Sequence, residues 1–424
     1  MNLKHNVRNS LPSMLLIATV FVISTITSLI MKVPMSEIMG NFNYSVIVIL
    51  IAMELFTNLI VETGIMEFLA IKLALVSKGG KRNCVFLFGI LMFFISAFLN
   101  NITAVMIILP VIFVLLKALN ADTKYISIFF SVILALSNTG GASSPIGDFP
   151  AIVIMTSKIT TFTEYLFKAF PLFLVTSLIL LVFWSAFIKE KSDSKSTKQL
   201  AVELLQSRYR NYKVRYDILI PLGFVMFVMF VAWSVIPQDI LPPEMIAIIG
   251  YCIGIVVASA KGIKIKQSMD MKSVLTISSF LLLATVVSAS GVLIKVAAFL
   301  ENSIPDSKML LIVIMLITSL ISGLVSAGPA AAAMLPVIVN LCNTTLSAQS
   351  EWVAIAYAAS ICAGSSLFLW SATAGFILSS KIDDANLEYN NEKVGWGIKS
   401  YFKYGIVNYF IQITIAIVWI ALIV

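Results

Sequence analysis

Long apolar runs recur along almost the whole chain. Seven of them are long enough to cross a membrane as helices: 11–31, 44–61, 169–188, 217–236, 243–260, 273–290 and 404–424. A helix needs about 20 predominantly apolar residues to cross the hydrocarbon core. The runs do not alternate between apolar and polar positions, as the strands of a membrane β-barrel would. The pattern therefore predicts an all-α polytopic membrane protein.

Shorter apolar segments, interrupted by Gly, Ser, Asn and Pro, lie between these spans. They occupy 84–99, 102–119, 126–137 and 145–157 in the first half, and 309–325, 329–346, 352–363 and 372–380 in the second. Irregular backbone at membrane depth is tolerated only against protein or a water-filled cavity. We therefore expect each half to hold a re-entrant hairpin (84–119, 309–346) and a broken helix (126–157, 352–380). Whether the amphipathic segments 63–77 and 291–304 span the membrane or lie in its interface stays open.

The interrupted segments form a weak internal repeat. The residues that align at one constant spacing are Ser96 and Ser322, Pro110 and Pro336, Asn138 and Gly364, and Ile152 and Leu378. The stretch 189–216 is polar and basic, as expected of a cytoplasmic linker. We therefore divide the chain into a first repeat at 1–188, this linker, and a second repeat at 217–424.

Charge is scarce, and its distribution predicts the topology. Charged residues make up 12% of the chain, against about 25% in a soluble domain. With the N-terminus in the cytoplasm, 24 of the 29 Lys and Arg residues fall on the cytoplasmic side, where they are expected to be in excess. Those outside are Lys32, Lys158, Lys168, Lys295 and Lys308. The asymmetry requires the two repeats to be inverted, with the C-terminus outside the cell.

The location of the +8 net charge and the residue inventory exclude several classes of function. The basic residues are orientation signals in loops, so we expect the lipid bilayer as partner and no nucleic acid. The four cysteines lie in apolar segments, and His5 is the only histidine, so no disulfide framework or metal site is expected. Without metal-ligand spacing or a nucleophile–base pair, an enzyme is not expected either. No ATP-binding motif is present, so primary pumping would require a separate ATPase partner.

The tip of the first hairpin is one candidate site. Asn100 and Asn101 are adjacent there, and Thr103 begins the next helix. Amides at membrane depth are costly unless they serve a buried or wet site. Their oxygens can bind a cation, and the helix N-terminus adds N–H groups and a partial positive charge. An ordinary N-capped turn is the alternative.

A polar stretch at 137–148 interrupts the first broken helix. Its candidate site residues are Ser137, Asn138, Thr139, Gly140, Gly141, Ser143, Ser144 and Asp148. We expect the two glycines to unwind the backbone and Pro145 to restart the helix. Unwound carbonyls can bind Na⁺, and the candidate Na⁺ ligands are Asn101, Asn138, Gly141 and Asp148. A polar loop outside the membrane is the alternative.

The equivalent residues of the second half carry no carboxylate or amide. They are Ser326, Gly328, Pro329, Gly364, Ser365, Ser366 and Thr373. The first half therefore suits a cation, and the second a neutral or anionic group. Glu54, in the middle of a span, is a candidate proton relay; a buried acid bonded to a neighbouring helix is its alternative.

The polar stretch resembles the ion-transporter superfamily, which includes ArsB-type arsenite pumps, NhaD-type Na⁺/H⁺ antiporters and divalent-anion/Na⁺ symporters. The family pattern N-x-G-G-x-x-x-x-I-G-D-x-P is matched by Asn138, Gly140, Gly141, Ile146, Gly147, Asp148 and Pro150. This chain departs from the antiporters at Ser326 and Ala327, where they carry Asp-Asn, and at Ala151, where the family has asparagine. The resemblance implies a scaffold domain, a transport domain and often a homodimer.

These features predict a secondary active transporter of the bacterial inner membrane that moves a small ion coupled to Na⁺ or H⁺, without a cofactor. An antiporter or permease of the ArsB or NhaD type is the first interpretation. A Na⁺-coupled symporter for a di- or tricarboxylate or another small oxyanion is the second. A channel is a remote alternative, because re-entrant hairpins also occur in channels.

Overall fold

The computed structural model describes residues 3–188, 203, 213–262, 271–389 and 392–423, and this part of the chain is almost entirely helical. The first half contains α1 (Leu3–Met31), α2 (Met35–Asn41), α3 (Tyr44–Val61), α4 (Ile65–Val76), α5 (Lys81–Ser96), α6 (Asn101–Ala118), α7 (Thr123–Ala142), α8 (Phe149–Thr156) and α9 (Phe162–Ala186). The second half contains α11 (Tyr216–Val235), α12 (Pro243–Ala260), α13 (Met271–Ala289), α14 (Val292–Ser303), α15 (Ser307–Val325), α16 (Ala327–Asn343), α17 (Ser350–Ser365), α18 (Gly375–Asp384) and α19 (Ile398–Ile423).

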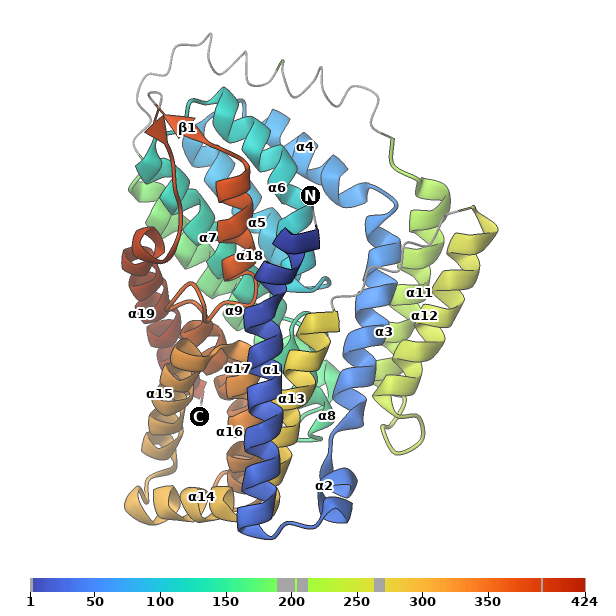
Figure 1. Ribbon diagram of the computed structural model, residues 1–424, viewed down its shortest axis with the longest axis vertical. Coiled ribbons are helices and arrows are strands. Elements are labelled where there is room, and N and C mark those ends of the chain that lie inside the picture. Colours follow the sequence, from blue (N-terminus) through green and yellow to red (C-terminus); the bar gives the residue numbers. More distant parts are fainter. Residues whose placement is uncertain (1–2, 189–202, 204–212, 263–270, 390–391, 424) are drawn as a thin grey trace.

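Among the described residues, eight helices are long and apolar enough to cross a membrane, or up to ten if each bent pair counts as one span. The all-α polytopic fold is therefore confirmed, with one small addition: β1 (Glu388–Tyr389) pairs antiparallel with β2 (Glu392–Lys393). The chain bends by 68° between α13 and α14, and α14 lies across the ends of its neighbours (Figure 1). Which end of the molecule faces the cytoplasm stays a prediction.

The two re-entrant hairpins enter from opposite ends of the molecule, which confirms the inverted topology. Figure 1 shows α5, α6 and α7 in the upper half, and α15, α16 and α17 in the lower half. Each hairpin packs against the broken helix of its own half, α5 on α7 and α15 on α17. Most of the predicted linker at 189–216 lies outside the described residues.

Matching contacts in the two halves correct the predicted repeat register. Ser96 Oγ donates to the Ser137 carbonyl over 2.7 Å, and Ser322 Oγ donates to the Ile361 carbonyl over 2.8 Å. Ser322 follows Ser96 by 226 residues, whereas Ile361 follows Ser137 by 224. The spacing read from the hairpins is therefore two residues too long for the broken helices, and Asn138 is equivalent to Cys362 rather than to Gly364.

Some element boundaries differ from the prediction for local reasons. The helix predicted at 169–188 begins at Phe162, because Thr161 and Glu164 form a capping box in a polar first turn that an apolar run does not reveal. Likewise, α19 begins at Ile398 rather than 404. The short helix α2 was not predicted.

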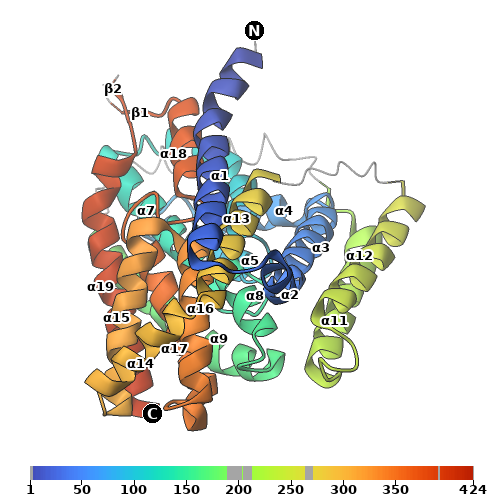
Figure 2. The same cartoon turned by 60° about the horizontal axis from the view of Figure 1, so that its bottom comes forward.

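A separate layer of helices stands beside the hairpins. α3 packs on α12, and α12 on α11; Figures 1 and 2 both show α11 and α12 at the edge of the molecule. Apolar side chains such as Ile220, Phe224 and Phe227 are exposed on α11, as expected of a surface that faces lipid. This layer packs on the rest of the molecule where α3 meets α8 and where α11 meets α9, and Phe98 stacks on Phe230 between them.

Candidate functional site

The tip of the first hairpin is held by hydrogen bonds from both of its asparagines. Asn100 caps α6, since its Oδ1 accepts from the Ile102 amide over 2.9 Å. Asn101 is completely buried, and its Nδ2 donates to Asp148 Oδ2 over 3.0 Å. Its Oδ1 accepts a hydrogen bond from Ser96 Oγ. The capped-turn interpretation thus holds for Asn100, whereas Asn101 reaches the broken helix. Thr103 lies half-buried in the first turn of α6.

Asp148 occupies the N-cap of α8. Its Oδ1 accepts from the Phe149 amide over 2.8 Å, and its Oδ2 accepts from Asn101. An ionised carboxylate offers about four acceptor positions, so these two contacts leave capacity for a cation. The residue is only partly buried.

The expected unwinding at the two glycines is wrong. Gly140 and Gly141 are helical, and α7 continues from Ser137 to Ala142, so the break covers residues 143–148. A Cβ on Gly141 would lie 2.6 Å from Asn101 Oδ1, and one on Gly140 would collide with the Phe93 carbonyl. These glycines are needed because α7 approaches the hairpin too closely for a side chain.

Most hydroxyl groups of the polar stretch are bonded within the protein. The Ser143 hydroxyl donates to the Gly140 carbonyl over 2.6 Å, and the Ser137 hydroxyl donates to the Leu134 carbonyl over 2.8 Å. Ser144 donates to the Ala97 carbonyl, which ties the break to the hairpin tip. Thr139 pairs with Ser177 of α9 over 2.7 Å. Ser144 and Thr139 thus join the broken helix to its neighbours, and Asn101 and Asp148 are the groups that converge.

Two tyrosines that the sequence analysis missed bind the carbonyls at the ends of the broken helices. Tyr165 OH donates to the Ala142 carbonyl over 2.8 Å, and Tyr401 OH donates to the Ser366 carbonyl over 2.7 Å. The carbonyls at a helix C-terminus lack intrahelical partners. A tyrosine in an apolar span carries no sequence signal of this role.

The second half has the same hairpin and broken helix, but its site residues carry no carboxylate. Ser326, at the tip of the second hairpin, has a φ of 139°, a strained value for an L-residue. The Ala327 amide and the Ser326 hydroxyl each donate to the Ser371 carbonyl over 3.3 Å. Ser371 Oγ in turn lies near the Gly364 and Ser365 carbonyls, at 3.2 and 3.1 Å. Thr373 lies half-buried in the break before α18, and Pro329 in the first turn of α16.

The two half-sites face each other. A Cβ on Gly328, in the first turn of α16, would lie 3.6 Å from the ring of Phe149, the residue after Asp148. α8 and α16 pack along each other. The N-terminus of a helix from the second half therefore packs against Phe149, the residue that follows Asp148.

Glu54 lies in α3, outside the hairpins and the broken helices. It is buried in α3, at 8% exposure, and its backbone carbonyl accepts from the Thr57 hydroxyl over 3.0 Å. The hydrogen-bond partners of Asp148 are Asn101 and the Phe149 amide, and Glu54 is not among them. A proton-relay role for Glu54 stays a prediction.

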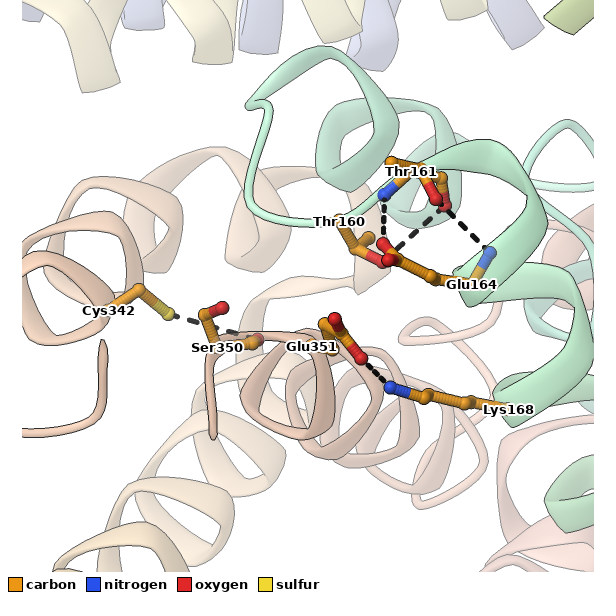
Figure 3. A network of polar contacts seen from close by, with 7 residues as sticks. All are labelled: Thr160, Thr161, Glu164, Lys168, Cys342, Ser350 and Glu351. Carbon is orange, nitrogen blue, oxygen red and sulfur yellow. Dashed lines mark hydrogen bonds and ion pairs between the residues drawn. The ribbon is translucent and has the colours of Figure 1, made fainter. Parts of the chain in front are cut away.

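A second polar group lies where α9 meets α17. Figure 3 shows Lys168 of α9 reaching Glu351 of α17, with which it forms an ion pair. Lys168 Nζ also lies 4.9 Å from the centre of the Trp352 ring. Glu164 turns back to the Thr161 amide over 2.9 Å. This group joins the two repeats at the edge of the hairpin layer.

Comparison with known proteins identifies the family. An uncharacterized transporter of Mycobacterium tuberculosis is 23% identical over 343 residues, which cover 80% of this chain and 78% of that protein. The Na(+)/H(+) antiporter NhaD of Halomonas elongata is 31% identical over 160 residues, 38% of this chain and 31% of its own. Both support the resemblance to the ion-transporter superfamily.

A solved structure and a family match complete the identification. The YdaH transporter of Alcanivorax borkumensis has a similar fold, with a TM-score of 0.52 at 13% identity and 97% of each chain covered. Residues 6–362 match the family described as CitMHS, citrate transporter. The chain is therefore a multi-pass secondary transporter and belongs to the CitMHS citrate transporter family.

Proposed function

We propose that this protein is a symporter that couples Na⁺ to the movement of a small carboxylate such as citrate or succinate. One observation carries the proposal: Asn101 and Asp148 pair at the start of α8, and the next residue, Phe149, packs against the N-terminus of α16, which carries no charged side chain. A cation and an anion that bind next to each other each lower the cost of binding the other. Coupling of this kind is what a symporter requires.

The cation would be held by the first half. Asp148 supplies a carboxylate, Asn101 an amide oxygen, and the break at 143–148 supplies carbonyl groups. Oxygen ligands of this kind suit hard cations, and unwound backbone in transporters is known to bind Na⁺. The helix N-termini of α6 and α8 keep the site from becoming too negative to release its ion.

The anion would be held by the second half. α16 begins with a run of small residues, Ala327 to Ala333, and carries a partial positive charge at that end. Small side chains let a ligand approach the backbone closely, and no acidic side chain from this turn opposes a carboxylate. The description of the matched family as citrate transporters supports the same substrate class.

Na⁺/H⁺ antiport is the second candidate, and Asp148 itself favours it. A carboxylate that binds Na⁺ and H⁺ in turn is all that such an exchange needs, and NhaD of Halomonas elongata is similar over 160 residues. Against it, Ser326 and Ala327 replace the Asp-Asn pair that the antiporter resemblance implies for the second hairpin.

Reconstitution in liposomes separates the two candidates. The vesicles would contain a pH-sensitive dye, and uptake of radiolabelled citrate and succinate would be followed under an inward Na⁺ gradient or a matched choline gradient. For symport we expect at least tenfold faster uptake with Na⁺, and no dye response to Na⁺ alone. A rise of internal pH under the inward Na⁺ gradient is not expected of symport, because it requires H⁺ to leave as Na⁺ enters; that response, without any solute uptake, would establish antiport and overturn the symport proposal.

A further inference from the structure

A buried set of hydrogen bonds joins α7, α17 and α19 where the two repeats meet. Asn138 of α7, Ser366 at the end of α17, and Gln412 of α19 are each at most 3% exposed. Asn138 Nδ2 lies 3.3 Å from Ser366 Oγ, and Gln412 Nε2 lies 2.9 Å from the same oxygen. Polar side chains buried this deeply are held in place by their partners, because an unpaired one is costly.

The roles of donor and acceptor in this set are fixed by the chemistry of its members. A serine hydroxyl has one proton to donate and two lone pairs to accept. Both amide nitrogens can only donate, so Asn138 and Gln412 together fill the acceptor positions of Ser366. Its own proton then goes to the carbonyl of Cys362, 3.3 Å away. The hydroxyl of Ser366 is thereby fully used.

Gln412 is held in its orientation by a second contact. The Cys362 thiol lies 3.5 Å from Gln412 Oε1, and a thiol can donate to that oxygen. The amide nitrogen of Gln412 is therefore turned toward Ser366. Without this nitrogen, Ser366 could turn its proton toward Asn138, and the Asn138 amide could rotate to present its oxygen to Ser366.

We infer that Gln412 is a positioning residue that fixes the Asn138 amide, acting through Ser366. With its nitrogen bound to Ser366, Asn138 keeps its carbonyl oxygen for the coupling cation. The inference rests on the proposed function, because it assigns this oxygen to the Na⁺ site. It also makes the orientation of Asn138, in the first half, depend on α17 and α19 of the second half.

A comparison of equivalent positions in the two halves supports the assignment of Asn138 as the residue that the others orient. Cys362 stands at the position in α17 that Asn138 occupies in α7, and Ser366 corresponds to Ala142. The second half therefore contributes a thiol and a hydroxyl where the first has an amide and a methyl group. Within this set, Asn138 is the side chain from the first half, and the other three serve to orient it.

The test compares Gln412→Leu with Asn408→Leu, one turn earlier on α19. Asn408 is also buried and also uses its amide, since it accepts from Trp184 Nε1 over 2.7 Å and donates to the Ser131 carbonyl over 3.4 Å. Neither of these bonds involves the Ser366 hydroxyl. Both substitutions remove buried hydrogen bonds, so a general loss of stability would affect them alike.

We expect Gln412→Leu to raise the Na⁺ concentration for half-maximal uptake about five- to tenfold, the effect of one lost hydrogen bond. The maximal rate should change less than twofold. Asn408→Leu should leave the Na⁺ concentration for half-maximal uptake unchanged. Ser366→Ala, a smaller change, should act like Gln412→Leu, and provides the test if Gln412→Leu fails to fold.

The decisive arm is the same substitution in an Asn138→Ala background. Because the effect passes through the Asn138 amide, Gln412→Leu should then add nothing to the shift in Na⁺ dependence. An equal shift in both backgrounds, or an equal shift from Asn408→Leu, would overturn the inference while leaving symport intact. A wild-type protein whose uptake ignores Na⁺ would instead overturn the proposed function, and the inference with it.

Discussion

The Asn101 amide donates a hydrogen bond of 3.0 Å to the Asp148 carboxylate, which joins the tip of a re-entrant hairpin to the start of α8. The two residues are 47 positions apart in the chain, and both lie where a helix begins. Two partial positive charges therefore converge on one carboxylate and one amide oxygen. The carboxylate and the amide oxygen can bind a cation, and the partial positive charges weaken that binding so that the cation can also leave.

Replacing Asn101 tests the amide half of this pair. Asn101→Leu removes a candidate cation oxygen and leaves the buried Ser96 hydroxyl with one partner fewer. We expect the Na⁺ concentration for half-maximal uptake to rise at least tenfold, since each lost ligand to a charged group is worth about 1.5–3 kcal/mol. Uptake measured across a Na⁺ titration checks this, and an unchanged titration curve would exclude Asn101 from the cation site.

The close approach of α7 to the hairpin predicts a steric effect at Gly141. A Cβ there would lie 2.6 Å from Asn101 Oδ1 and 2.9 Å from Asp148 Cβ. We expect Gly141→Ala to displace this pair and to reduce uptake more than tenfold, at a cost in stability of about 1–3 kcal/mol. Gly223→Ala, on α11 with no neighbour within 4 Å of the added carbon, is the matched control and should transport normally. Equal activity of the two variants would argue against the close contact.

The sequence predicts the spans well, because length and hydropathy alone decide whether a helix can cross a membrane. It misplaces the first break, because Gly140 and Gly141 suggest unwinding when read without their neighbours. The same glycines are required by the Phe93 carbonyl and the Asn101 side chain, which only the folded chain brings near. Local composition cannot distinguish these two uses of glycine.

The site shows the same limit. Asn101 and Asp148 are visible in the sequence because polar groups at membrane depth are rare and costly. Gln412 and Tyr165 are also buried and also bind groups of the broken helices. Each, however, is a single polar residue in an apolar helix, and its partner lies far away in the chain. The sequence indicates which polar groups are energetically unfavourable at membrane depth, but not what they contact.

The ion pair of Lys168 and Glu351 is expected to hold the two repeats together. Their side chains are 24% and 39% exposed, so solvent screening limits the pair to about 1 kcal/mol. We expect Glu351→Lys to lower the melting temperature of the purified protein by placing two positive charges together. The double variant Lys168→Glu with Glu351→Lys should recover most of this loss. A double variant no more stable than the single one would show that the pair contributes nothing.

A surface link between Lys158 and Asp239 predicts a pH effect of known sign. Lys158 Nζ lies 2.8 Å from Asp239 Oδ1, and this hydrogen bond, with the lysine charge, holds the pKa of Asp239 below its ordinary value. A lowered pKa stabilises the folded state above the ordinary value of about 3.9, and this contribution is lost as pH falls through the lowered pKa.

The difference in melting temperature between wild type and Asp239→Asn should therefore be small but present at pH 6, and should vanish as pH falls through the lowered pKa of Asp239. Lys158→Met should show the same dependence. Both side chains are largely exposed, so 1 M salt should also remove the difference. A difference that grows with acidification would have the wrong sign for this link.

Uptake of radiolabelled citrate and succinate by Asp148→Asn in liposomes, under an inward Na⁺ gradient, tests the role of the first half-site most directly. Asn is an equally good N-cap, so α8 should remain intact. Asp306→Asn is the matched control, since Asp306 caps α15 by accepting from the Met309 amide over 2.8 Å. We expect Asp306→Asn to retain Na⁺-driven uptake and Asp148→Asn to fall to the level of the choline gradient. Na⁺-driven uptake by Asp148→Asn with an unchanged Na⁺ dependence would contradict a cation site at Asp148.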